Sequence, residues 1–210
     1  MELTIDIHTS LGLFISLAIL AAIPSISVLL VSSRAAVYGF SHGAAVALGI
    51  VMADILFISI ALYGMGLLLP LIGHWELLIR MLAAAYLFWL AILLWRQKDL
   101  KQPALQVDPR ISLKSSFLMG FIVTLADHKA ILFYMGFFPA WVTLSELTLT
   151  DTGVIFLVTF IAVGGVKCVY AFLAATVGQS YFKQGHHYLN KLAAILLVGV
   201  GAMIVLSLWK

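Results

Sequence analysis

The chain has 210 residues, of which 63% are hydrophobic and only 10% are charged, and its mean hydropathy is +1.13. Soluble domains are about half apolar and about a quarter charged, so this composition excludes an ordinary soluble enzyme and indicates a protein solvated by lipid. The formal net charge of +3 allows a nucleic-acid partner, but we expect none, because most of the basic residues lie in the links between apolar stretches. A single cysteine, Cys168, excludes an internal disulfide or a dithiol redox pair.

Six stretches are long and apolar enough to cross a bilayer as α-helices, which takes about 20 residues each. The predicted fold class is therefore all-α, a polytopic membrane protein with six transmembrane helices in a single membrane domain, 1–210. Acidic residues precede the first stretch where a secretory signal needs basic ones, so we expect a retained helix there. In chain order the stretches are residues 11–32, 44–69, 77–95, 115–141, 152–177 and 189–208.

Lysine and arginine concentrate in alternate links between these stretches. Arg34 lies in the first link, a basic cluster from Arg96 to Lys114 in the third, and Lys183 and Lys191 in the fifth. Basic links stay in the cytoplasm. We therefore expect a multi-pass protein with both termini outside the cytoplasm.

A polar link, about residues 99–113, divides the six stretches into a first half, about 1–98, and a second half, about 114–210. A repeat of three spans must insert with opposite topology in the two halves, which predicts two inverted three-helix repeats. Transporters built this way place the substrate site where one helix in each half is interrupted. Here the first helix of each half is interrupted about halfway, by Pro24 with Ser25 and Ser27, and by Asp127-His128-Lys129.

Five ionisable residues lie deep in the predicted helices, where each costs about 2.5–3.5 kcal/mol on insertion scales and so marks function. Two carboxylates and two ammonium groups sum to zero charge, which suits a small zwitterionic substrate. Histidine titrates near neutral pH, which would serve proton coupling. The alternative is that buried ion pairs of Asp54 or Asp127 with Lys167 only join helices. The candidate substrate- and proton-binding residues are Asp54, Asp127, His128, Lys129 and Lys167.

No catalytic residue, metal site or cofactor is predicted, because the helices contain neither a dithiol nor an HExxH-type pair. A channel or a purely structural membrane subunit is a further alternative. Two groups of glycines are expected to shape the packing. Gly39, Gly43 and Gly49 should allow a tight turn and close helix contact, and Gly164 and Gly165 should let a neighbouring helix approach.

The order and spacing of these residues resemble the LysE/RhtB family of amino-acid exporters over nearly the whole chain. The similarity includes Pro24, the run from Gly39 to Asp54, and Asp127-His128-Lys129, where the family has Asn-Pro-Lys. It continues in Phe138-Pro139 and in Leu189-Asn190-Lys191-Leu192.

The resemblance implies a bacterial inner-membrane exporter of amino acids or related metabolites, driven by the proton gradient and assembled as a homodimer. It implies functional roles for Pro24, Asp54 and Lys129. This chain departs from the family at Ser25, Asp127, His128 and Lys167, which leaves the substrate open. Because related superfamilies export metals, a divalent or heavy-metal cation exporter is the alternative, with Asp54, Asp127 and His128 as ligands. Lys129 and Lys167, which lie near these ligands, argue against a metal site.

Overall fold

The computed structural model describes residues 6–23, 25–64, 76–96, 111–138, 142, 147–177 and 186–207, and every regular element in these ranges is helical. The predicted all-α class is thus confirmed for this part of the chain. The elements are α1 (Ile7–Ala22), α2 (Ile26–Tyr38), α3 (Phe40–Ser59) with the π-helical η1 (Ile60–Gly64), α5 (Glu76–Arg96), α6 (Leu113–Leu125), α7 (His128–Phe137), α8 (Leu149–Thr159), the π-helical η5 (Phe160–Gly164), α9 (Gly165–Val177) and α10 (His186–Ser207).

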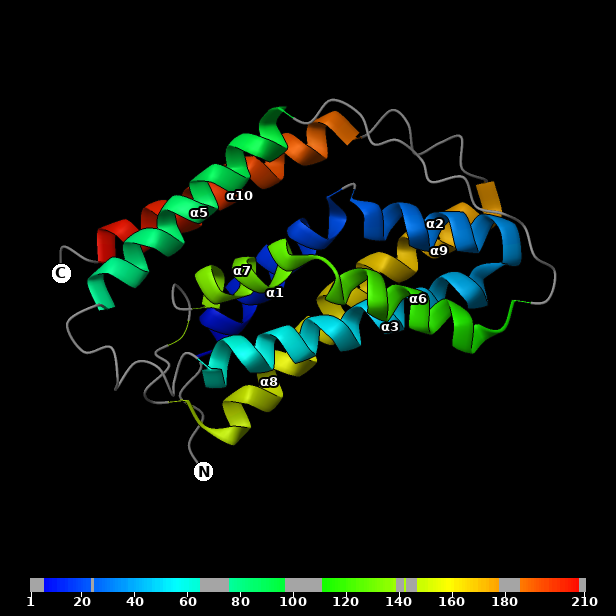
Figure 1. Cartoon of the computed structure of the whole chain (residues 1–210), viewed down its shortest axis with the longest axis horizontal. Coiled ribbons are helices and arrows are strands. Elements are labelled where there is room, and N and C mark those ends of the chain that lie inside the picture. The colour runs from blue at the N-terminus through cyan, green and yellow to red at the C-terminus, as the bar shows by residue number, and fades with distance from the viewer. Residues whose placement is uncertain are drawn as a thin grey trace.

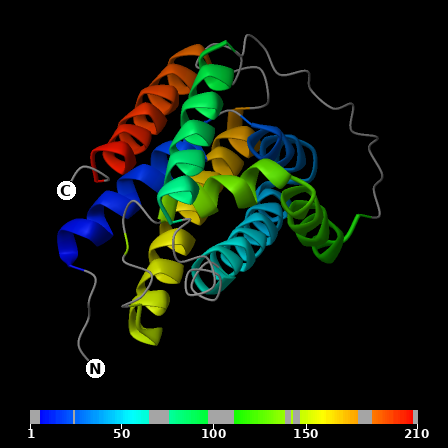
Figure 2. The same cartoon turned by 60° about the vertical axis from the view of Figure 1, so that its left-hand side comes forward.

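Along the long axis of the molecule, α1 and α2 run in one direction and α3 runs back, and in the same way α6 and α7 run in one direction and α8 and α9 run back (Figure 1). α1 begins and α10 ends toward the same end of that axis, and α5 and α10 lie side by side along one edge (Figures 1 and 2). The Lys191 ammonium of α10 lies over the Trp95 ring of α5, 5.4 Å from its centroid, and links this pair.

Two helices within the described ranges are long and apolar enough to cross a membrane. They are Phe40–Gly64, with 25 residues and a mean hydropathy of 2.5, and Leu149–Thr176, with 28 residues and a mean hydropathy of 2.2. α1 and α2 together are also long and apolar enough to cross a membrane. They form a third span if the 67° bend between them is treated as a break within one span. The six-span topology and the two inverted repeats remain predictions.

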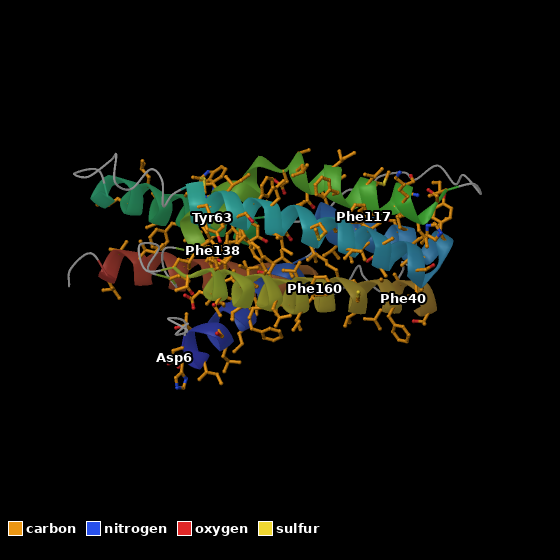
Figure 3. The ribbon with its side chains drawn as sticks, turned by 90° about the horizontal axis from the view of Figure 1, so that it is seen from below. Asp6, Phe40, Tyr63, Phe117, Phe138 and Phe160 are labelled. Atoms are coloured by element: carbon orange, nitrogen blue, oxygen red, sulfur yellow. The ribbon has the colours of Figure 1, made fainter. Side chains whose placement is uncertain are left out.

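Large apolar side chains cover much of the outside of the bundle. Leu157 on α8, Ile122 on α6 and Ile195 on α10 are each about 60% exposed, and Figure 3 shows Phe160 on the outer side of the α8–α9 helix. The inside is apolar as well, with Leu87 among its fully buried residues. A helix bundle that is apolar on both sides requires lipid around it.

Glycines set the closest helix contact, between α3 and α6. A Cβ atom at Gly49 would lie 2.1 Å from the carbonyl oxygen of Phe117, and one at Gly120 would lie 2.2 Å from the carbonyl oxygen of Val46. The predicted close packing at Gly49 is thus confirmed, and Gly39, at φ 90°, forms the predicted turn.

The expectation for Gly164 and Gly165 is wrong. A Cβ atom at Gly165 would meet nothing within 4 Å, and one at Gly164 would only touch the Val51 side chain at 3.5 Å. These glycines instead mark the join between η5 and α9. The helix widens there into a π-helical turn, a feature common near functional sites.

Candidate functional site

The first half of the chain contains a break between α1 and α2. Ile23 and Ser25 have extended backbones, with ψ of 130° and 174°, while Pro24 lies outside the described residues. A helix that ends leaves its last carbonyl groups without helical partners. Two side chains of α9 supply donors instead: the Lys167 ammonium donates to the Ala21 carbonyl at 3.0 Å, and the Tyr170 hydroxyl donates to the Ala22 carbonyl at 2.7 Å.

Lys167 also holds the start of α2. Its ammonium donates to the Ser27 hydroxyl at 3.0 Å, and Ser27 is hydrogen-bonded to Ser25 at 2.8 Å. The lysine is only 3% exposed, and its positive charge lies at the carbonyl end of α1, where the helix dipole favours a cation. One side chain therefore fixes both sides of the break.

The second break lies between α6, which ends at Leu125, and α7, which begins at His128. Asp127 occupies it, so its carboxylate lies at the amino end of α7, which favours an anion. Its backbone carbonyl accepts a hydrogen bond from the Ala130 amide at 2.9 Å. Asp127 is placed as predicted, in the break, while the side chains of His128 and Lys129 lie outside those that the structure describes.

Asp54 lies on α3, is 6% exposed, and interacts with groups at both helix breaks. The Tyr134 hydroxyl of α7 donates a hydrogen bond to its carboxylate. The Asp54 charge is attracted by Lys167 beside the first break and repelled by Asp127 in the second. Asp127 also acts electrostatically on Tyr86 of α5.

Asp54, Asp127, Tyr134 and Lys167 line one cavity of about 650 Å³, which we call the central cavity. Its volume falls within the range of about 300–1,000 Å³ typical of small-molecule sites. Most of its wall is apolar, for example Leu20 and Phe133. Its polar lining consists of Ser25, Ser27, Asp54, Thr124, Asp127, Tyr134 and Lys167.

The Lys167 ammonium group of the central cavity can contact a ligand. Lys167 donates to two neutral oxygens, so one of the three donors of its ammonium group is left for a solute. Lys167 is also attracted electrostatically by Asp54, in addition to these two hydrogen bonds. The buried Thr124 hydroxyl has no hydrogen-bond partner within the described ranges, so it is a further polar contact for a bound molecule.

Three residues of this site were missed by sequence reasoning. Tyr170 follows Lys167 by three residues and so shares its face of the helix, a signal that could have found it. Tyr134 and Thr124 had no such signal, because their roles depend on how α6 and α7 pack against α3. Asp54, Asp127, Lys167 and Ser25 were predicted, and the structure brings all four to the central cavity.

Comparison with known proteins gives a family and one similar membrane protein. A family model for LysE type translocators matches residues 18–208 and so includes both helix breaks. The chain is also 43% identical over 205 residues to an uncharacterised membrane protein of Synechocystis sp., a match that covers 98% of this chain and 99% of that protein. No solved structure matches the chain.

Proposed function

Because this chain belongs to the family of LysE type translocators, we propose that it exports a small zwitterionic metabolite of the amino-acid class in exchange for protons. Family membership makes it a multi-pass membrane transporter of small molecules. The observation that carries the finer proposal is the meeting of Lys167, Asp54 and Asp127, from three separate segments, in one cavity between two helix breaks.

The central cavity offers complementary groups for a zwitterion. The Lys167 ammonium is fixed at the first break, where it can take the carboxylate of the solute. Asp54 and Asp127 can take its ammonium group. The remaining wall is mostly apolar, so the side chain of the solute packs against residues such as Leu20 and Phe133.

Proton exchange follows from competition for Asp54. A carboxylate that holds a substrate ammonium group cannot hold a proton at the same time. In this scheme the solute leaves to the outside, a proton then neutralises Asp54, and that proton is released inward before the next solute binds. His128 stays a candidate for the proton path.

The proposed membrane arrangement keeps the orientation that the basic links predict. The protein lies in the bacterial inner membrane with six spans, as two inverted halves, and both termini face outward. A homodimer is proposed from the family resemblance alone. The ends of α2 and α9 lie toward the opposite end of the long axis from the start of α1 (Figure 1), which is consistent with the links after them lying on one side.

Reconstituted vesicles with a pH-sensitive dye inside test the proposal. Adding a zwitterionic amino acid that is transported should move protons across the membrane, whereas adding no solute should not. The substitutions Asp127→Asn and Lys167→Met should each abolish this flux in protein that still inserts. Asp6→Asn provides a matched control, because Asp6 is an exposed aspartate outside the cavity and asparagine also caps helices.

The outcomes separate the alternatives. Proton flux driven by divalent cations but by no amino acid would support the metal exporter instead. Conduction without proton exchange would indicate a channel. Loss of insertion in both cavity variants would mean that the charges only join helices.

A further inference from the structure

Arg34 is a buried cation that the described part of the chain leaves largely unpaired. It lies on α2, one turn before that helix ends, and is 4% exposed. Its Nε and Nη1 atoms have no hydrogen-bond partner among the residues that the structure describes. Its Nη2 atom donates to the Met119 sulfur of α6 at 3.1 Å, and its guanidinium lies 5.4 Å from the centroid of the Tyr38 ring.

These contacts are a poor substitute for a counter-charge. A thioether sulfur is a weak acceptor, and a ring face gives a cation only modest stabilisation. Lys167 is equally buried yet has two oxygen acceptors and the attraction of Asp54. Buried charges in proteins are paired as a rule, so Arg34 stands apart from the other buried cation of the described chain.

The surrounding helices supply no carboxylate at this level. α2 packs against α3, α6 and α9, and these four helices together contain a single acidic residue, Asp54. The Gly43 position of α3 abuts Ala35, the neighbour of Arg34. Asp54 is 11 residues further along α3, or about 16 Å at the rise of an α-helix.

We propose that Arg34 is a binding site for an oxyanion of the carboxylate or phosphate type. The guanidinium fork presents parallel N–H groups that match two oxygens of such an anion. Methionine is flexible and adapts to its surroundings, so the Met119 sulfur can yield its place on Nη2 to an anion oxygen. The orphan donors on Nε and Nη1 then gain acceptors.

This site is separate from the central cavity, whose lining contains none of Arg34, Tyr38 and Met119. Along α2 the arginine is seven residues beyond Ser27, about 10 Å at helical rise. The inference therefore does not depend on which solute is transported. The anion has two possible sources, a lipid headgroup at the membrane surface or a soluble anion, which have the same recognition chemistry.

Thermal unfolding of the full chain in a phosphate-free maltoside detergent tests the site. One arm adds phosphatidylglycerol, with a monoacylglycerol as an uncharged comparison. The other arm adds sodium phosphate or sodium acetate, with sodium chloride at equal ionic strength. In one of the two arms the unfolding midpoint should rise saturably, by about 5–10 °C at a hundredfold excess over Kd.

Variants connect this response to Arg34. Arg34→Met should lose it, while Arg34→Lys should keep a weaker response because lysine retains the charge but lacks the fork. Arg96→Met removes an exposed arginine of α5 and should respond as the wild type does. No saturable rise in either arm, or an equal rise in Arg34→Met, would overturn the proposal. If Arg34→Met fails to fold, an Arg34→Lys response equal to the wild type overturns it.

Discussion

Replacing Gly49 by alanine adds a methyl group at the closest contact between two helices. The new Cβ atom would lie 2.1 Å from the Phe117 carbonyl oxygen and 2.8 Å from the Phe121 amide nitrogen, whereas ordinary contact begins at 3.4 Å. Both neighbours are backbone atoms of α6, so no side chain can rotate away. α3 and α6 must therefore move apart by about 1 Å, which disturbs packing along the whole contact.

The expected cost follows from two opposing effects. Overpacking of this kind destabilises a protein by about 1–3 kcal/mol, and a clash of backbone with backbone lies at the upper end. Alanine stabilises a helix by up to about 1 kcal/mol relative to glycine. We expect Gly49→Ala to lose about 2 kcal/mol of stability, which is about 4–8 °C in the unfolding midpoint for a chain of this size.

Thermal unfolding of the purified protein in detergent measures this shift. Gly199→Ala on α10 is the matched control, because a Cβ atom there meets nothing within 4 Å, and its midpoint should stay the same or rise. Gly49→Ala should also lower transport, since the α3–α6 contact places Asp54 near the second helix break. Equal midpoints for the two variants would refute the reasoning.

Other substitutions test separate contacts. Gly39→Ala should destabilise by about 1–3 kcal/mol, because φ 90° with ψ 169° is a conformation nearly restricted to glycine; a midpoint like the wild type would contradict this. Tyr170→Phe should cost about 1–3 kcal/mol, as the Ala22 carbonyl loses its donor, and an unchanged midpoint would show that another donor replaces it. Tyr134→Phe should leave insertion intact and reduce proton flux in vesicles, since Asp54 loses a hydrogen bond; normal flux would remove Tyr134 from the mechanism.

The sequence was most informative about features that the lipid environment restricts, namely the length of helices and the placement of polar residues within them. Apolar length located two of the helices to within a few residues: the predicted stretch 77–95 corresponds to Glu76–Arg96, and 189–208 to His186–Ser207. Polar residues inside such stretches are costly, and for that reason Asp127 marked the break between α6 and α7. The same reasoning singled out Asp54 and Lys167 before any packing was known.

Other features depended on packing that local patterns do not specify. The sequence suggested an ion pair between Asp54 and Lys167, but which oxygens Lys167 binds depends on how α9 lies against the end of α1. Gly120 could not be distinguished from other helix glycines, because its role comes from the Val46 carbonyl opposite it. The π-helical turn at η5 was also unforeseen, since no residue type specifies it.

Accessibility of Ser25 to a charged thiol reagent tests the central cavity most directly. In a Cys168→Ser background, Ser25→Cys in intact membranes should react with a membrane-impermeant methanethiosulfonate that carries a trimethylammonium group, and saturating transported solute should slow the reaction. Leu157→Cys, on the exposed outer surface, should stay unreactive because lipid covers it. A solute pathway at the helix break predicts this contrast. A Ser25→Cys variant as inert as Leu157→Cys, or one that solute does not protect, would contradict it.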